Sequence, residues 1–339
     1  MKSSMKLRVF LMYLVMAAIN SCSSEEAALG SYARGFNIII EEPKELADDY
    51  LGAIGKEYKP NKNYRLETNW ARSKLDEVRE AFKAGEGNAP GSMSETVDVA
   101  NAALEAAEQM STTYDAVKSY LDSGENKQDN GAKGQELHSK MLSHITAFHD
   151  NLSKLNKLLS VAETAVTQAA LADADTETFG FWVQKTQLAA KQIIEADSPE
   201  SFKERIEALD VTNKELSAWK AKRGELHPVF ATYSSTFDKF VGAARSAREA
   251  VDKAIAYDAA LVSDTSTAAT VEDAVKAKGK KRKGKRQGGR KVKKKGGKKS
   301  TPRTPMVMEK QVNELIEIYN QLISLGNTIG ELEANGVMK

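Results

Sequence analysis

Apolar side chains recur at three- and four-residue steps along most of the chain, with polar side chains between them. This period matches one face of an α-helix, whereas the alternation typical of a half-buried strand is nearly absent. Polar stretches rich in glycine or proline divide the pattern into segments. The pattern predicts helices over the following ranges: 43–58, 63–84, 92–121, 135–174, 176–196, 199–209, 212–219, 228–255 and 306–334.

Three of these helices carry recognisable start signals. Ser92 with Glu95, and Thr212 with Glu215, have the spacing of a capping box, in which both side chains satisfy free backbone N–H groups. Ser198 is followed by proline, which combines a favoured N-cap residue with a favoured first helical residue. We therefore expect one helix to begin at each of these positions.

None of these helices can bury its apolar face alone, and long helices joined by short polar turns pack as antiparallel neighbours. The sequence therefore predicts an all-α fold, an elongated antiparallel helical bundle over residues 43–275. A C-terminal helix over 306–339 is expected to pack on this bundle. The largest aromatic side chains are interpreted as core: Trp70, Trp182, Trp219, Phe237 and Phe240.

Residues 22–42 are expected to lie outside the bundle. The stretch SSEEAALGSYARG after Cys22 is small, polar and glycine-containing, which is typical of a flexible tether. The run FNIII at 36–40 is β-like and predicts a short extended segment packed on the body. Pro43 then stands where a helix can begin, because proline suits the first helical position.

The first 21 residues have the organisation of an export signal. Lys2, Lys6 and Arg8 precede an unbroken apolar run over 9–19. This run is too short to cross a bilayer as a helix, which needs about 20 residues. It is typical of the apolar region of a signal peptide, and the tetrapeptide INSC at 19–22 closes it.

This arrangement resembles the lipobox of bacterial lipoproteins, in which an apolar, a variable and a small residue directly precede a cysteine. In that family the cysteine is acylated and becomes the first residue of the mature chain. Ile19 and Asn20 depart from the strict pattern, which prefers leucine and a small residue, and are of the kind seen in spirochaetal lipoproteins. The resemblance implies a lipid on Cys22 and an exported protein anchored to the outer membrane or cell surface.

Cys22 is the only cysteine among 339 residues, which excludes an internal disulfide and argues against a cysteine-based zinc site. Acyl chains give stable membrane anchoring when there is more than one, at about 0.8 kcal/mol for each buried CH₂. The alternative interpretation is an ordinary secretory signal, cleaved nearby, that leaves Cys22 as a free thiol.

The net charge of +2 hides a strong segregation of charge. Residues 276–303, the cationic segment, contain 16 basic residues and no acidic one, so the remainder has 33 basic against 47 acidic residues, a net charge of −14. Scarce apolar residues and mutual repulsion predict a disordered loop over 276–305. The candidate polyanion-binding residues are Lys280, Lys281, Arg282, Lys283, Lys285, Arg286, Arg290, Lys291, Lys293, Lys294, Lys295, Lys298 and Lys299.

A flexible cationic run suits a polyanion, because many phosphate or sulfate contacts release counterions. On an exported protein the accessible partners are host glycosaminoglycans and acidic host proteins. Anionic lipid headgroups are a further possibility, and nucleic acid is less favoured because of the export signal. A loop that merely offsets the charge of the acidic body is the remaining alternative.

No pattern for catalysis is present. The chain has no nucleophile elbow, no Walker-type phosphate loop and no dinucleotide-binding glycine pattern after a strand. His138, His144 and His149 share one predicted helix, but His138 and His149 stand about 16 Å apart along its axis and His144 points elsewhere. We expect solvated or half-buried histidines, no metal site, no cofactor, no small-molecule substrate and no enzymatic activity.

The leading hypothesis is a lipid-anchored surface protein that acts by binding. It looks like the surface lipoproteins of spirochaetes, many of which are helical and engage host matrix or serum proteins. Two alternatives stay open: a structural or periplasmic lipoprotein whose bundle only spaces the envelope, and a secreted effector that binds nucleic acid.

Overall fold

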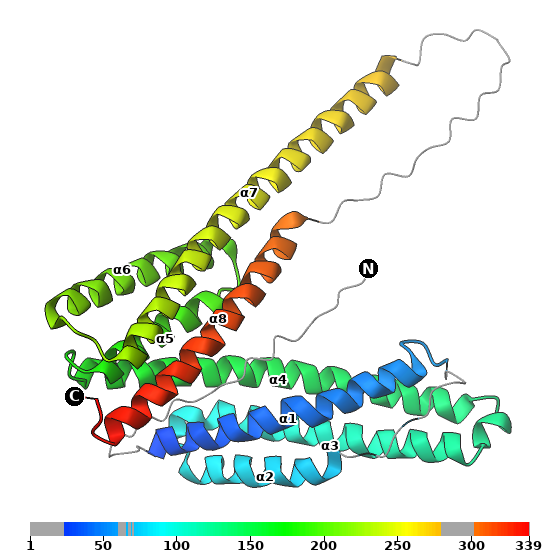
Figure 1. Ribbon diagram of the computed structural model, residues 1–339. Helices are drawn as coiled ribbons and strands as arrows, with labels where there is room; N and C mark the ends of the chain where they lie inside the picture. The colour runs from blue at the N-terminus through cyan, green and yellow to red at the C-terminus, as the bar shows by residue number, and fades with distance from the viewer. Residues whose placement is uncertain (1–23, 60–65, 67–68, 70, 279–301, 339) are drawn as a thin grey trace. The chain divides into compact units, whose positions relative to one another are not determined.

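The computed structural model describes residues 24–59, 66, 69, 71–278 and 302–338, with the backbone alone described for Glu42 and for 261–278 (Figure 1). Every regular element within these residues is a helix, and none of the described residues belongs to a strand. The prediction of an all-α fold is therefore confirmed.

The chain divides into two compact units, residues 1–173 and 174–339. The single bundle predicted over 43–275 is wrong, because the boundary between the units falls inside it. Unit 1 contains α1 (Ser24–Ile54), α2 (Ala71–Asn88), η1 (Gly91–Met93), α3 (Ser94–Asp122), η2 (Glu125–Lys127) and α4 (Ala132–Asp173). Unit 2 contains α5 (Phe179–Ile194), α6 (Pro199–Arg223), α7 (Pro228–Lys278) and α8 (Arg303–Ala334).

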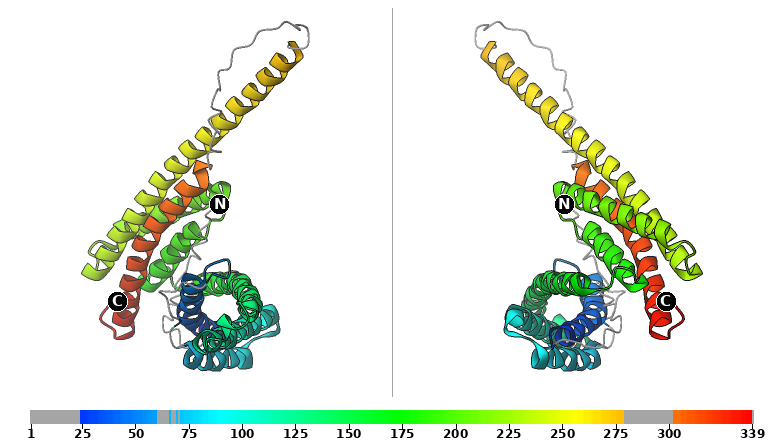
Figure 2. Two further views of the ribbon diagram at one scale, coloured as in Figure 1. Left: turned by 90° about the vertical axis from the view of Figure 1, so that its right-hand side faces the viewer. Right: turned by 90° about the vertical axis from the view of Figure 1, so that its left-hand side faces the viewer.

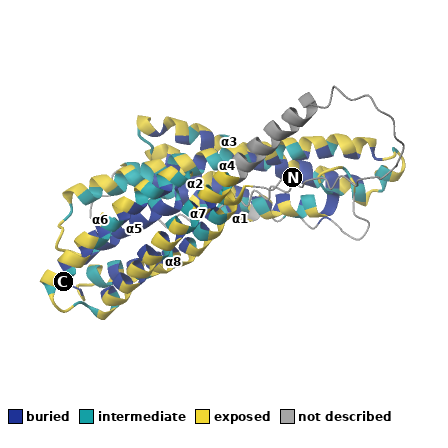
Figure 3. Ribbon diagram, turned by 90° about the horizontal axis from the view of Figure 1, so that it is seen from above, coloured by how far each residue is buried: buried dark blue, intermediate teal, exposed yellow. Residues whose placement is uncertain are grey.

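The long helices of unit 1 surround one core. Each packs on the next along the chain, and α4 returns to pack on α1, as the end-on views in Figure 2 show. The ion pairs Arg72–Asp115 and Arg79–Glu108 run in opposite directions along α2 and α3, so these two helices are antiparallel. The buried side chains form stripes along the helices (Figure 3).

Helix α1 overturns the prediction for residues 22–42. It begins at Ser24 and continues to Ile54, through the FNIII run that was expected to be extended. A flexible tether is therefore wrong from Ser24 onward, because apolar side chains at helical spacing bury α1 in the core despite its polar composition. The buried apolar side chains of this stretch are those of Ala28, Leu29, Tyr32, Ala33, Phe36, Ile39 and Ile40.

Pro43 lies inside α1 and does not begin a helix, which corrects the second part of that prediction. A proline in a helix interior removes one backbone hydrogen bond and costs about 3 kcal/mol. The helix continues because apolar side chains on both sides of the proline, such as Ile39 and Leu46, enter the same core. Burial on both sides offsets the local cost.

The predicted start signals have different outcomes. Ser198 caps α6, since its hydroxyl accepts a hydrogen bond from the backbone N–H of Ser201 at 3.1 Å. Thr212 does not begin a helix, because α6 continues through it and its hydroxyl donates to the carbonyl of Ala208. Ser92 lies within η1, and the residue that precedes α3 makes no side-chain capping bond.

Unit 2 repeats the packing order of unit 1. Helix α5 packs on α6, α6 on α7, α7 on α8, and α8 returns to α5. The C-terminal helix predicted from residue 306 begins three residues earlier, at Arg303, and packs on its unit as expected. Gln187 of α5 donates to the carbonyl of Leu322 in α8 at 3.1 Å, within the buried interior.

Aromatic rings fill the end of unit 2 where α6 finishes and α7 begins. Phe179, Trp219 and Phe230 lie with ring centroids 4.7–5.6 Å apart, and Trp182 contacts the same cluster. The interpretation of the predicted aromatic residues as core is confirmed for Trp182, Trp219, Phe237 and Phe240. Trp70 lies outside the described residues.

Candidate functional site

The residues that the sequence singled out lie outside the part of the chain that the structure describes. This holds for Cys22 and for the 13 basic residues between Lys280 and Lys299. The structure does describe both ends of the cationic segment: the helical backbone up to Lys278, and the chain from Pro302 onward.

Asp258 of α7 holds the first residues of α8. Its carboxylate accepts hydrogen bonds from the backbone N–H groups of Arg303 and Thr304, both at 2.9 Å, and from the Thr304 hydroxyl at 2.6 Å. These N–H groups have no partner within their own helix, and Pro302 supplies no side-chain cap. Helix α7 thus caps α8 through a contact between two helices.

The same bonds stabilise the ionised form of Asp258. They lower the pKa of its carboxyl group, and the bond from the Thr304 hydroxyl makes the largest contribution, followed by the backbone N–H of Arg303. A negative charge at the N-terminus of a helix also interacts favourably with the helix dipole. Asp258 is therefore a charged cap at neutral pH.

Arg303 is the last basic residue of the cationic segment and lies against α7. Its guanidinium carbon is 4.1 Å from the centre of the Tyr257 ring. Because Asp258 and Arg303 meet, the start of α8 lies beside residue 258 of α7. Helix α7 continues beyond that place to Lys278, and Figure 1 shows it projecting past the start of α8.

Asp258 was not among the residues predicted from the sequence. N-cap rules examine the residue directly before a helix, whereas Asp258 is 45 positions away from Arg303 in the chain. No local pattern could have identified it, because the capping contact exists only once α7 and α8 are packed together.

His138 is buried in unit 1, so the expectation of solvated or half-buried histidines is wrong for it. Its Nδ1 lies 2.8 Å from the Tyr50 hydroxyl and its Nε2 lies 3.2 Å from the carbonyl of Lys56. The rings of Tyr50 and Tyr58 lie 5.8 and 5.9 Å from the imidazole. Both ring nitrogens are engaged, and the side chain links α4 to α1 and to the chain after it.

The other histidines of α4, His144 and His149, are half-buried as expected. Burial lowers the pKa of His149, which favours its neutral form. Among the described residues, no group of three or more His, Cys, Asp or Glu side chains is arranged to hold a metal ion.

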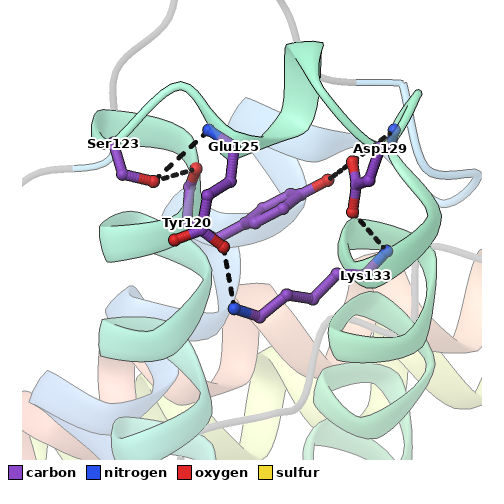
Figure 4. A network of polar contacts seen from close by, with 6 residues as sticks. Tyr120, Ser123, Glu125, Asp129 and Lys133 are labelled. Carbon is purple, nitrogen blue, oxygen red and sulfur yellow. Dashed lines mark hydrogen bonds and ion pairs between the residues drawn. The ribbon is translucent and has the colours of Figure 1, made fainter.

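A second polar cluster fixes the turn between α3 and α4 (Figure 4). The Tyr120 hydroxyl donates to Asp129 at 2.7 Å, and Asp129 also accepts the backbone N–H groups of Gly131 and Lys133. Lys133 pairs with Glu125 at 2.9 Å. Burial and the bond to Asp129 raise the pKa of Tyr120 to about 12, so the phenol stays protonated at neutral pH. The cluster stabilises the turn.

Comparison with known proteins places the fold in a family. A family model with the description "Protein of unknown function (DUF3829)" matches residues 29–273. The chain belongs to this family. The DUF3829 match begins inside α1 and ends inside α7, so it includes all but the first residues of α1 and agrees with α1 being part of the folded body. The cationic segment and α8 lie beyond it.

No curated protein matches the chain, and no solved structure does. The DUF3829 match therefore establishes family membership and does not assign an activity. Within the described residues, no helix is both long enough and apolar enough to cross a membrane.

Proposed function

We propose that this protein is exported, anchored by a lipid on Cys22, and acts by binding polyanions through the cationic segment. The observation that carries the binding proposal is the segregation of charge: 16 basic residues stand together in a chain whose remainder has a net charge of −14. Such a density favours a partner with many phosphate or sulfate groups, because each contact releases counterions. Export and anchoring rest on the pattern at residues 1–22.

Sulfated polysaccharides suit this segment better than nucleic acid does. The segment contains no aromatic residue, and proteins that bind single strands without sequence preference stack bases on aromatic side chains. Sulfate groups need only positive charge and hydrogen-bond donors, which lysine and arginine supply. On an exported protein, glycosaminoglycans are the polyanions of this class.

The structure makes a clean deletion possible. Asp258 holds the start of α8 on α7, and Gln187 and Glu333 hold α8 on α5, through contacts that involve none of residues 279–301. A neutral linker of the same 23-residue length in place of residues 279–301 should therefore leave α7 and α8 packed, since it can span the roughly 30 Å by which α7 continues beyond Asp258. Far-UV circular dichroism of the variant is the control for this.

Heparin chromatography tests the binding proposal. We expect the full chain to elute at clearly higher salt than the deletion variant, and its affinity to fall linearly with salt on logarithmic axes. A variant with every lysine of the segment changed to arginine keeps the charge and should elute close to the wild type. Elution of the full chain and the deletion variant at the same salt concentration would contradict the binding proposal.

Mass spectrometry of the mature N-terminus tests the anchor separately. We expect a chain that begins at Cys22 and carries acyl groups. A Cys22→Ala variant should lose the acyl mass and leave the membrane fraction. An unmodified terminus downstream of Cys22 in the wild type would contradict the anchoring proposal and leave the binding proposal untouched.

A further inference from the structure

The start of α1 restricts how far the body of the protein can lie from a lipid on Cys22. The helix begins at Ser24, so only Ser23 separates the two positions. Two residues of extended chain span at most about 7 Å. A long tether of the kind that holds a domain away from a membrane is therefore missing between Cys22 and α1.

Helix α1 cannot unwind easily to provide such a tether. Ala28 and Leu29 lie in its second turn and are fully buried, and Tyr32 and Phe36 follow on the same face. Unwinding the first turns would expose these side chains to water and open the core of unit 1. The position of Ser24 thus fixes one end of unit 1 close to the lipid.

The contacts of α1 identify the rest of that end. Gly85 of α2 lies against Tyr32, and Phe82 lies against Gly35, so α1 and α2 run in opposite directions. The beginning of α1 is therefore level with the end of α2 and with the connection to α3 at 89–93. The turn between α3 and α4 lies at the opposite end of unit 1 (Figure 1).

An exposed apolar side chain of α4 lies about 10 Å beyond the start of α3. Lys154 of α4 pairs with Glu95 in the first turn of α3, and Val161 follows seven residues later on α4. Val161 is 70% exposed, the highest value among the large apolar side chains that the structure describes. An apolar side chain near a headgroup layer is favourable, whereas its exposure to water is not.

We propose that this end of unit 1 lies against the lipid headgroup layer, with the α2–α3 connection toward the membrane and the α3–α4 turn away from it. The inference rests on the proposed lipid on Cys22. Glu25 and Glu26 occupy the first turn of α1. Like-charge repulsion makes zwitterionic headgroups a better partner for this end than anionic ones.

A matched pair of labels on one helix tests this orientation. Ser94 and Ser119 are both exposed residues of α3, and 25 residues of helix place them about 37 Å apart. Ser94→Cys and Ser119→Cys are near-isosteric and provide single attachment points for a fluorophore, since an acylated Cys22 has no free thiol. The acylated full chain is reconstituted in phosphatidylcholine vesicles that contain lipids with a nitroxide headgroup, which quenches only nearby fluorophores.

We expect severalfold stronger quenching of the label at residue 94 than of the label at residue 119. A flexible Gly/Ser insertion of about 15 residues between Ser23 and Ser24 adds a reach of roughly 20 Å and should remove this difference. Equal quenching at the two positions in the chain without the insertion would overturn the orientation. An unmodified N-terminus in the mass spectrum would instead remove the lipid anchor, so the two failures are distinguishable.

Discussion

Gly35 and Gly85 show how closely α1 and α2 approach each other. A Cβ atom on Gly35 would lie 2.5 Å from the ring of Phe82, and one on Gly85 would lie 2.8 Å from the ring of Tyr32. Both rings are fully buried, so neither can move away without displacing its neighbours. The two glycines are therefore required by packing, although each is an unfavourable residue for a helix interior.

Gly35→Ala should lower the free energy of unfolding by about 1–3 kcal/mol, because an overpacked core must shift its rings. Gly242→Ala is the matched control, since nothing lies within 4 Å of its new methyl group in α7. There the gain in helix propensity should raise stability by up to about 1 kcal/mol. Urea denaturation measures both changes, and stabilisation by both substitutions would contradict the close approach of α1 and α2.

Two buried tyrosines of α1 differ in what their hydroxyl groups do. The Tyr50 hydroxyl lies 2.8 Å from Nδ1 of His138, whereas the Tyr32 hydroxyl has no hydrogen-bond partner among the described residues. Tyr50→Phe leaves a buried imidazole nitrogen unsatisfied and should cost about 1–3 kcal/mol. Tyr32→Phe should be neutral or slightly stabilising. Equal costs in chemical denaturation would show that the Tyr50–His138 bond contributes nothing.

At the scale of elements, the cap that α7 provides for α8 predicts a pH dependence. The folded structure lowers the pKa of Asp258 below its usual value. The stabilisation is therefore fully present above the pKa of the unfolded chain, about 3.9, and is lost as the pH falls through the lower folded value.

Asp258→Asn should speed amide hydrogen exchange in the first turn of α8 at neutral pH. The wild type should approach the variant only below about pH 4, where the Asp258 carboxylate begins to take up a proton. Thr304→Val removes the hydroxyl bond and keeps the charge, so its effect should be smaller. Exchange rates in α8 that do not differ between wild type and Asp258→Asn would exclude the cap.

Local patterns predicted some elements well and others poorly. The starts of α3, α4 and α8 fall within three residues of prediction, because a clear apolar period and polar turns delimit these helices. The part of α1 before Pro43 was missed: its polar start, the β-branched run FNIII and Pro43 each favour another structure locally. Burial of one face outweighs all three, and that face is recognised only when its partners are known.

At the scale of the whole molecule, two units make separate folding tests possible. Each unit has packed helices of its own, and the core of unit 1 runs through α1, α2, α3 and α4. Residues 24–173 expressed alone should be helical and unfold cooperatively in urea. A fragment of residues 43–173 lacks the first part of α1. It should not unfold cooperatively, because its core loses Leu29, Tyr32 and Phe36. Cooperative unfolding of the shorter fragment would restore the tether interpretation.

Some features of the candidate site can be predicted from the sequence, and others require the tertiary structure. The charge of the cationic segment and the context of Cys22 are properties of neighbouring residues, so they can be seen in the sequence without a structure. The contact between Asp258 and Arg303, and the end of unit 1 that holds Ser24, depend on helices distant in the chain. Sequence patterns carry no information on which helices become neighbours in this case.

The sequence by itself determined the helical class, the positions of most turns, the segregation of charge and the pattern that implies a lipid. These follow from period, composition and spacing, which act over a few residues. Only the tertiary structure decided that residues 24–42 belong to the core, that the chain forms two units and that α7 caps α8. Those outcomes depend on the burial of apolar faces and of hydrogen-bonding groups between segments far apart in the chain, which local propensities oppose or ignore.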